Sequence, residues 1–127
     1  MPDKSIADRL LIKPGYEVLV INAPQDYSTL LGPLPPDVKI SKQPSAPADL
    51  IQIFLTSKKE LEEDLVRLKA VLKPKGLLWI TYPKGGSKTK TDLNRDIIRV
   101  YAQTLGLQAV AMIAIDDTWS ALRLKKV

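Results

Sequence analysis

The stretch Asp49–Tyr82 is the feature that most constrains the fold of this chain. It holds two almost continuously apolar runs, Leu50–Leu55 and Leu77–Tyr82, with a helical segment, Ser57–Lys73, between them. Strands that are covered on both faces have continuous apolar runs, whereas half-exposed strands alternate. Two such strands joined by one helix are parallel and are connected by a right-handed crossover. The stretch therefore predicts one strand–helix–strand unit of an α/β sheet.

The helical segment carries its own start and stop signals. Ser57 followed by Glu60 forms a capping box, in which the hydroxyl accepts from a free N–H group and the carboxylate reaches back. Pro74 cannot continue the helix, and Gly76 permits a turn into the next strand. One apolar stripe follows helical spacing and should face the sheet: Leu61, Leu65, Leu68 and Leu72.

Strands and helices also alternate on both sides of this unit. Before it we expect a helix, a strand, a short helix and a short strand, at Ser5–Ile12, Glu17–Ile21, Asp26–Leu31 and Val38–Ile40. After it we expect a helix and an antiparallel hairpin, at Asp92–Leu105, Leu107–Ile115 and Trp119–Lys125. The strand at residues 38–40 is short and flanked by prolines, which predicts a place at a sheet edge.

The helix after the central unit has a predicted cap and a predicted buried face. Thr91 can accept a hydrogen bond from the first turn, and Gly106 ends the helix. The expected buried stripe is Leu93, Ile97, Tyr101 and Leu105, with Ile98 alongside.

Composition limits the chemistry that is available. Cysteine and histidine are both absent, which removes thiolate nucleophiles, imidazole bases and the common zinc sites. Acid–base chemistry would depend on Asp, Glu, Lys or Tyr, and we assign no catalytic residue and no metal site. We expect one α/β domain over residues 1–127. No apolar run approaches the roughly 20 residues that a membrane span needs, and the N-terminus has no signal-peptide core, so we expect a cytoplasmic protein.

The net charge of +5 is unevenly distributed. Residues 1–63 hold 7 basic and 9 acidic side chains, and residues 64–127 hold 12 and 5. A basic half can mark an anionic partner such as a nucleic acid, and the alternative is an ordinary solvated surface.

Three segments resemble the S-adenosylmethionine-dependent methyltransferases. "LLIKPGYEVLVI" resembles the approach to the first strand of that family, "LVRLKAVLKPKGLLWIT" a helix, turn and strand late in the fold, and "GLQAVAMIAIDDTWSALRLKK" the closing hairpin. The resemblance implies a Rossmann-like three-layer α/β sandwich. Its sheet would be mostly parallel and six-stranded, in the order 2-1-3-4-6-5, with the last strand antiparallel.

A closer resemblance is to a small bacterial family of unknown function whose members look like truncated methyltransferases. It is carried by "KPGYEVLVINAP", "LLGPLP", "YPKG", "TDLNRD" and "DDTWSALR". A full methyltransferase has one more strand and helix after the second strand, for which this chain has no room. The closer resemblance brings no known activity with it.

The usual methyltransferase grip on its cofactor is missing at both of its halves. The family places a Gly-rich acidic turn after the first strand, so that the backbone approaches the ligand, and an acid after the second strand. Here the first turn is Asn22-Ala23-Pro24-Gln25-Asp26-Tyr27, without glycine, and Ser41-Lys42-Gln43 follows the second strand, without an acid. We therefore predict no cofactor, and S-adenosylmethionine in particular is not expected in its usual mode.

Ligands of such sheets bind beyond the carboxyl ends of the strands, where the strand order reverses. The candidate crevice there consists of Asn22, Ala23, Pro24, Gln25, Thr56, Ser57, Tyr82, Pro83 and Lys84, with Asp116 and Asp117 toward the same edge. Each of these residues also has a structural interpretation as a turn residue, a helix cap or a packing aromatic.

The loop before the last helix is a candidate anion site. It combines flexible backbone, a hydroxyl and cations, followed by two arginines at a spacing of four: Lys84, Gly85, Gly86, Ser87, Lys88, Arg95 and Arg99. Such a loop before a helix N-terminus favours anions, and the alternative is a solvated loop.

Three hypotheses of function remain open. The first is a non-catalytic methyltransferase-like domain that binds a protein partner or a small anionic ligand. The second is a methyltransferase with a rearranged cofactor site, anchored by Asp26 or Asp116. The third is nucleic-acid binding through the basic half, by Lys84, Lys88, Lys90, Arg95 and Arg99, with Tyr101 as the only aromatic ring near these cations. The two open sheet edges also allow a homodimer.

Overall fold

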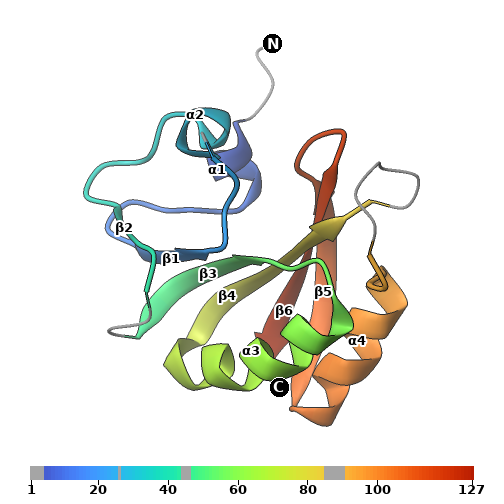
Figure 1. Ribbon diagram of the computed structural model, residues 1–127. Helices are drawn as coiled ribbons and strands as arrows, with labels where there is room; N and C mark the ends of the chain where they lie inside the picture. Colours follow the sequence, from blue (N-terminus) through green and yellow to red (C-terminus); the bar gives the residue numbers. More distant parts are fainter. Residues whose placement is uncertain (1–4, 26, 44–46, 85–90) are drawn as a thin grey trace.

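The computed structural model describes residues 5–25, 27–43, 47–84 and 91–127 as one six-stranded sheet with helices on both faces (Figure 1). The strand order is β2-β1-β3-β4-β6-β5, and β6 is antiparallel to both of its neighbours. The strands are β1 (Glu17–Ile21), β2 (Lys39–Ser41), β3 (Ala48–Phe54), β4 (Leu72–Pro83), β5 (Leu107–Ala114) and β6 (Trp119–Lys126). The helices are α1 (Ile6–Arg9), α2 (Tyr27–Leu31), α3 (Lys58–Val71) and α4 (Arg95–Thr104). The predicted α/β class, strand order and antiparallel last strand are all confirmed.

The central strand–helix–strand unit forms as predicted. β3 and β4 are parallel neighbours, with Leu50 opposite Leu77 and Ile53 opposite Ile80. Both strands are buried on their two faces, which explains why their sequences do not alternate. In Figure 1, α1 and α2 lie above the sheet and α3 and α4 lie below it, so that two cores form.

Side chains alternate between these two cores along each strand. The α3–α4 core contains Ile51, Ile53, Leu61, Leu65, Leu68, Leu78, Ile80, Ile98 and Ala102. The α1–α2 core contains Ala7, Leu10, Val18, Val20, Tyr27, Leu31, Leu50, Phe54 and Trp79. The indole N–H of Trp79 donates to the carbonyl of Leu10 at 3.0 Å, which joins α1 to the middle of the sheet.

The turn predicted at Pro74-Lys75-Gly76 lies inside a strand instead. Leu72 already pairs with Ala48 and Leu77 pairs with Leu50, so four residues of β4 lie opposite the single residue Asp49 of β3 and bulge out between the two pairs. The φ angle of Gly76 is not in the left-handed region. Glycine is required at position 76 for lack of space, because a Cβ there would lie 2.5 Å from Cδ1 of Leu72 and 3.0 Å from the carbonyl oxygen of Lys73.

The cap predicted for α4 is corrected by the structure. Asn94 is the N-cap, and its side chain accepts from the N–H of Ile97 at 2.9 Å. The Thr91 hydroxyl instead donates to the carbonyl of Thr56 at 2.6 Å, and thereby links the loop before α4 to the loop before α3. The helix begins three residues later than predicted. Its fully buried residues are Ile98 and Ala102; Leu93 is buried before the helix begins, whereas Ile97, Tyr101 and Leu105 of the predicted stripe are only partly buried.

The N-terminal strands agree closely with the prediction, but α1 ends at Arg9 instead of the predicted Ile12, and Leu11 has a left-handed φ of 69°. β1 has the predicted bounds, and β2 is a short, exposed strand at the sheet edge, shifted by one residue. No helix in the described residues is long and apolar enough to cross a membrane.

Candidate functional site

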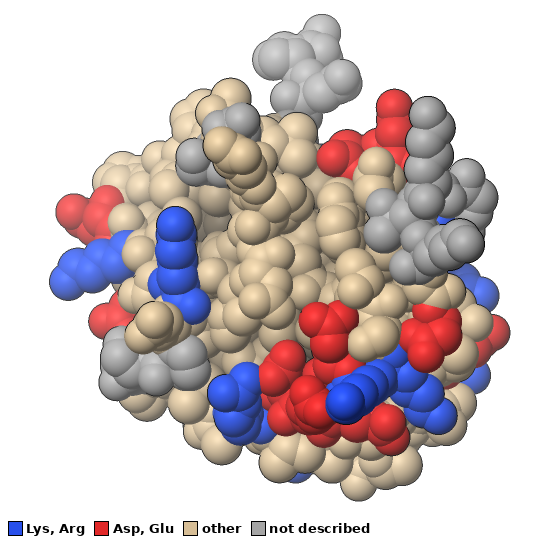
Figure 2. All heavy atoms as spheres, in the orientation of Figure 1, with Lys and Arg blue, Asp and Glu red and all other residues tan. Residues whose placement is uncertain are grey.

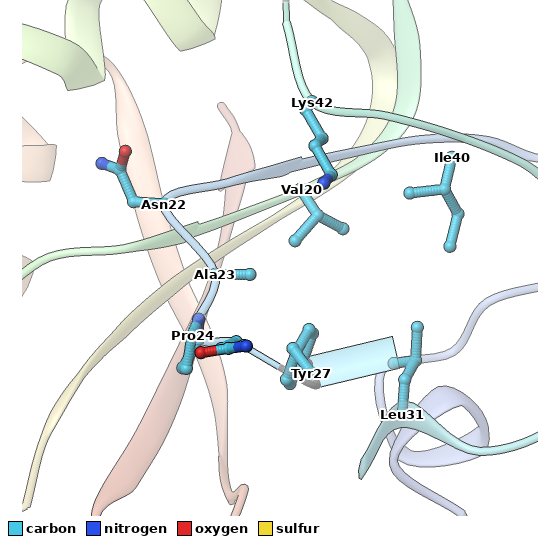
Figure 3. Close-up of a pocket in the computed structure, with 9 residues that line it drawn as sticks. Val20, Asn22, Ala23, Pro24, Tyr27, Leu31, Ile40 and Lys42 are labelled. Atoms are coloured by element: carbon cyan, nitrogen blue, oxygen red, sulfur yellow. The ribbon is translucent and has the colours of Figure 1, made fainter. Parts of the chain in front are cut away.

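A pocket of about 490 Å³ lies between α2 and the carboxyl ends of β1 and β2 (Figure 3). Its floor and roof are mostly apolar, and its lining residues are Val20, Asn22, Ala23, Pro24, Gln25, Tyr27, Leu31, Ile40 and Lys42. Volumes between about 300 and 1,000 Å³ are typical of small-molecule sites. Four residues of the predicted crevice, at positions 22–25, therefore line an actual cavity.

The outer side of this pocket is open because β2 is the last strand of the described sheet. In a longer methyltransferase-like sheet, a further parallel strand outside β2 would need a right-handed crossover, which brings its helix to the α2 face. Here Ile40 remains 41% exposed. The pocket thus occupies the space that such a helix would cover.

Asn22 shapes the turn after β1 with its backbone. Its φ is 61°, in the left-handed region that asparagine tolerates better than most residues. Its side-chain amide donates to the carbonyl of Phe54 at 3.5 Å and points away from Ile40 and Lys42 (Figure 3). Asn22 therefore bridges the ends of β1 and β3, at the point where the strand order reverses, and the pocket lies on the β2 side of that point.

Lys42 supplies the cation of the pocket. It follows directly after β2, and its ammonium group points toward Val20 and the pocket (Figure 3). The resemblance to methyltransferases implies an acid after the second strand, so the charge here has the opposite sign. The sequence analysis noticed the missing acid but did not count Lys42 as a site residue, although its position after the strand was a usable signal.

A buried chain of hydrogen bonds supports the wall of the pocket. The Tyr27 hydroxyl donates to Oε1 of Gln52 at 2.7 Å, and Nε2 of Gln52 donates to the Thr81 hydroxyl at 3.0 Å. Gln52 and Thr81 are fully buried, and burial raises the pKa of Tyr27, so its hydroxyl stays protonated as a donor at neutral pH. The sequence analysis missed Gln52, although a polar residue inside an apolar run is a recognisable signal.

The five remaining residues of the predicted crevice, at positions 56, 57 and 82–84, are not among the lining residues of this pocket. Thr56 and Ser57 belong to the start of α3, where both hydroxyls donate to the Glu60 carboxylate at 3.0 and 3.3 Å. The Tyr82 hydroxyl contacts Sδ of Met112 at 3.3 Å and lies in the α3–α4 core, on the opposite face of the sheet. The backbone N–H of Lys84 donates to the carbonyl of Thr118 at 2.8 Å.

Asp116 has a structural role in the β5–β6 turn. Its carboxylate accepts from the backbone N–H groups of Thr118 and Trp119 at 2.8 and 2.9 Å. Trp119 in turn packs edge-on against Phe54, with the ring centroids 5.1 Å apart. These contacts account for Asp116 as a turn residue, and neighbouring Asp117 is exposed.

The predicted anion loop is described only at its ends. Gly85, Gly86, Ser87 and Lys88 lie outside the described residues, as does Asp26. Arg95 and Arg99 both lie near the carboxylate of Asp96, at 3.9 and 3.7 Å. Figure 2 shows charges of both signs over α3, with no stripe of one sign on that face. In the described part of the chain, no group of three or more Asp and Glu side chains could hold a metal ion.

Solved structures of methyltransferases share this fold. A DhpI–SAH complex matches with a TM-score of 0.65 and 10% identity, over 95% of this chain and 82% of the other. A SAM-dependent methyltransferase from Aquifex aeolicus has a TM-score of 0.63 and 13% identity, over 95% and 89%. A TehB-like SAM-dependent methyltransferase from Corynebacterium glutamicum has a TM-score of 0.61 and 14% identity, over 98% and 89%. At these identities the likeness concerns the fold alone.

The family of the chain follows from its second part. None of the curated proteins matches the chain. Residues 47–127, from the start of the central unit to the C-terminus, match the family described as "Protein of unknown function (DUF3052)". The pocket residues between Val20 and Lys42 precede that matched segment. The chain belongs to the DUF3052 family of proteins of unknown function, and its fold is methyltransferase-like.

Proposed function

We propose that this chain is a non-catalytic binding domain, which holds a small molecule with an apolar body and one anionic group in the pocket beside Lys42. The observation that carries the proposal is the combination of apolar walls with this cation in one open cavity of about 490 Å³. Binding pockets typically have apolar linings and a few polar groups that orient the ligand.

The apolar walls account for the body of the ligand. Val20 and Ile40 come from the sheet, and Tyr27 and Leu31 come from α2, so a flat or chain-like group can lie between the two layers. Because the Tyr27 hydroxyl is hydrogen-bonded to Gln52, the α2 wall of the pocket is held in place before a ligand binds. Such preorganisation lowers the entropic cost of binding.

Lys42 accounts for the anionic group. A lysine ammonium is a strong donor to carboxylate or phosphate, and the lining residues that the structure describes, which do not include Asp26, contain no acid. The same charge argues against the usual adenosyl mode, in which an acid accepts from ribose hydroxyls. The proposal therefore includes no S-adenosylmethionine and no methyl transfer.

The test is a thermal-shift and titration series on the full chain. The probes are benzoate, octanoate and adenosine monophosphate, with benzyl alcohol as a neutral counterpart and S-adenosylmethionine as the competing candidate. We expect at least one anionic probe to raise the melting temperature at a probe concentration of about 1 mM. Binding to the folded chain alone stabilises it measurably once the probe concentration reaches the dissociation constant. Benzyl alcohol should not.

Two lysine variants make the test specific. Lys42→Gln should weaken binding of the anionic probe by about tenfold, which corresponds to about 1.4 kcal/mol. Lys39→Gln is the matched control: it removes the same charge three residues earlier, within β2, but since Ile40 faces the pocket, Lys39 points to the other face. A probe that binds equally well to both variants contradicts the proposal. Tight binding of S-adenosylmethionine, unaffected by Lys42→Gln, would instead favour the methyltransferase hypothesis.

A further inference from the structure

The free edge of β5 is unusually apolar for an exposed strand. In the described part of the chain, β6 is the only strand that pairs with β5, so β5 ends the sheet on one side. Its sequence is LQAVAMIA, eight residues without a charge or a proline. Edge strands of natural proteins are usually short, charged or covered, because their unpaired backbone groups invite another strand.

The backbone of β5 offers hydrogen-bonding groups to that side. The N–H of Ile115 donates to the carbonyl of Trp119 at 2.9 Å, toward β6. Inward and outward groups alternate along an antiparallel pair, so the N–H and C=O groups of Ala114 and Met112 point away from β6. A donor from outside the sheet agrees with this direction, since the Arg9 guanidinium donates to the carbonyl of Ala114.

Apolar side chains flank these outward groups. Val110 is 37% exposed and Met112 is 48% exposed, and Ala114 is exposed as well. Burial of such side chains against a second apolar strand is favourable by about 25 cal/mol per Å².

The opposite edge, β2, has the features that protect an edge. It is three residues long, it contains Lys39, and Lys42 follows it. β5 has weaker protection: Val110 is an extra residue where the register with β6 shifts, and Arg9 covers one carbonyl. In the described part of the chain, the regular stretch Ala111–Ala114 remains open apart from the Ala114 carbonyl.

We propose that this stretch is a self-association surface, on which β5 of a second copy of this chain pairs antiparallel about a two-fold axis. A two-fold axis brings like residues close together, which an uncharged strand accepts and a lysine-bearing strand such as β2 does not. The pairing joins the two sheets into one. Because a short strand pair buries much less than the roughly 1,200 Å² of a stable interface, the dimer is weak and depends on concentration.

Sedimentation velocity over a concentration series tests this surface. We expect the wild-type chain to shift from monomer to dimer at protein concentrations on the order of 100 µM. Met112→Lys introduces two facing charges in the dimer and should raise the dissociation constant at least ~10-fold. Val66→Lys is the matched control, because Val66 is 53% exposed on α3 and the substitution adds the same charge. The dissociation constant of the Val66→Lys dimer should stay within about twofold of the wild-type value, as expected for a site away from the contact.

A second measurement does not depend on the charged variant folding well. The chain has no cysteine, so single cysteines at Ala111, Met112 and Ala114, made in turn, are clean reporters. Under mild oxidation, at least one of them should form an interchain disulfide, and Val66→Cys should not. The proposal is overturned by a wild-type chain that stays monomeric at millimolar concentration. The proposal is also overturned if the chain dimerises, Met112→Lys leaves the dimer intact, and none of the three cysteine variants forms an interchain disulfide.

Discussion

The Tyr27 hydroxyl donates a 2.7 Å hydrogen bond to Oε1 of Gln52, and this bond attaches α2 to the centre of the sheet. Both residues are buried, and Gln52 passes the contact on to Thr81 on the neighbouring strand. The short helix α2 has five residues and could not hold its place through its own backbone alone. The pocket wall thus depends on a polar contact inside an apolar core.

The first prediction concerns this contact. Tyr27→Phe leaves Oε1 of Gln52 buried without its donor, so the free energy of unfolding should fall by about 1–2 kcal/mol. Urea denaturation measures it. Tyr101→Phe is the control, because that hydroxyl makes an exposed 3.3 Å bond to the carbonyl of Glu62 and its loss should cost less than about 0.5 kcal/mol. Equal costs for the two variants would contradict the role given to Gln52.

The second prediction concerns the bulge at the start of β4. Gly76→Ala adds a Cβ that would lie 2.5 Å from Cδ1 of Leu72 and close to the backbone of Lys73. Relieving this overlap should lower the free energy of unfolding by about 1–3 kcal/mol.

Gly15→Ala is the control that separates steric crowding from backbone strain as the cause of the destabilisation. Gly15 has open space around it but a φ of 79°, so its substitution should cost about 1 kcal/mol through strain alone. If chemical denaturation shows that the Gly76→Ala variant is as stable as the wild-type chain, then β4 can shift at this point without cost, which would contradict the prediction.

The third prediction concerns the start of α4. Asn94→Ala removes the acceptor of the Ile97 N–H group and should destabilise the protein by about 1 kcal/mol. Asn94→Asp keeps an acceptor at the same place and adds a favourable charge at the helix N-terminus, so it should retain the wild-type stability. Thermal unfolding of the two variants side by side checks this, and the same loss in both would argue against Asn94 as the cap.

The fourth prediction concerns the pH dependence of stability. The hydrogen bond from the backbone N–H of Thr56 lowers the pKa of Glu60 from its ordinary value of 4.5, and the Thr56 and Ser57 hydroxyls add to this. Folding therefore favours the ionised carboxylate. Its contribution is complete above pH 4.5 and is lost as the pH falls through the lowered pKa of the folded state.

Glu60→Gln tests this contribution directly. The wild-type protein should be more stable than the variant at pH 7, and the difference in unfolding free energy should shrink steadily as the pH is lowered below 4.5. Chemical denaturation at a series of pH values measures the difference. Parallel stability curves for the two proteins across this range would mean that Glu60 has the same pKa in the folded and unfolded chains.

Much of the fold was predictable because its signals are local. Burial of a segment can be predicted from the residue types and spacing of that segment alone. This holds for the apolar runs of β1, β3 and β4 and for the leucine stripe of α3. The start of α4 was predicted less well, since Thr91 and Asn94 are both good caps and the choice depends on Thr56, 35 residues away in the chain.

The candidate site was predictable only in part. Strand ends are readable from sequence, and residues 22–25 after β1 do line the pocket. Tyr82 has the same kind of position after its apolar run, but the alternation of β4 turns its side chain to the opposite core. Lys42 joins the pocket because β2 pairs with β1, which brings two strand ends together from distant parts of the chain.

By itself, the sequence determined the alternation of strands and helices, the crossover unit and the absence of cysteine and histidine chemistry, because these depend on residue type and spacing. Only the tertiary structure decided that Asn22 bridges the ends of β1 and β3, that a cavity lies beside Lys42, and which backbone groups of β5 point away from β6. The physical reason is that cavities, long-range hydrogen bonds and open edges are properties of how elements pack together.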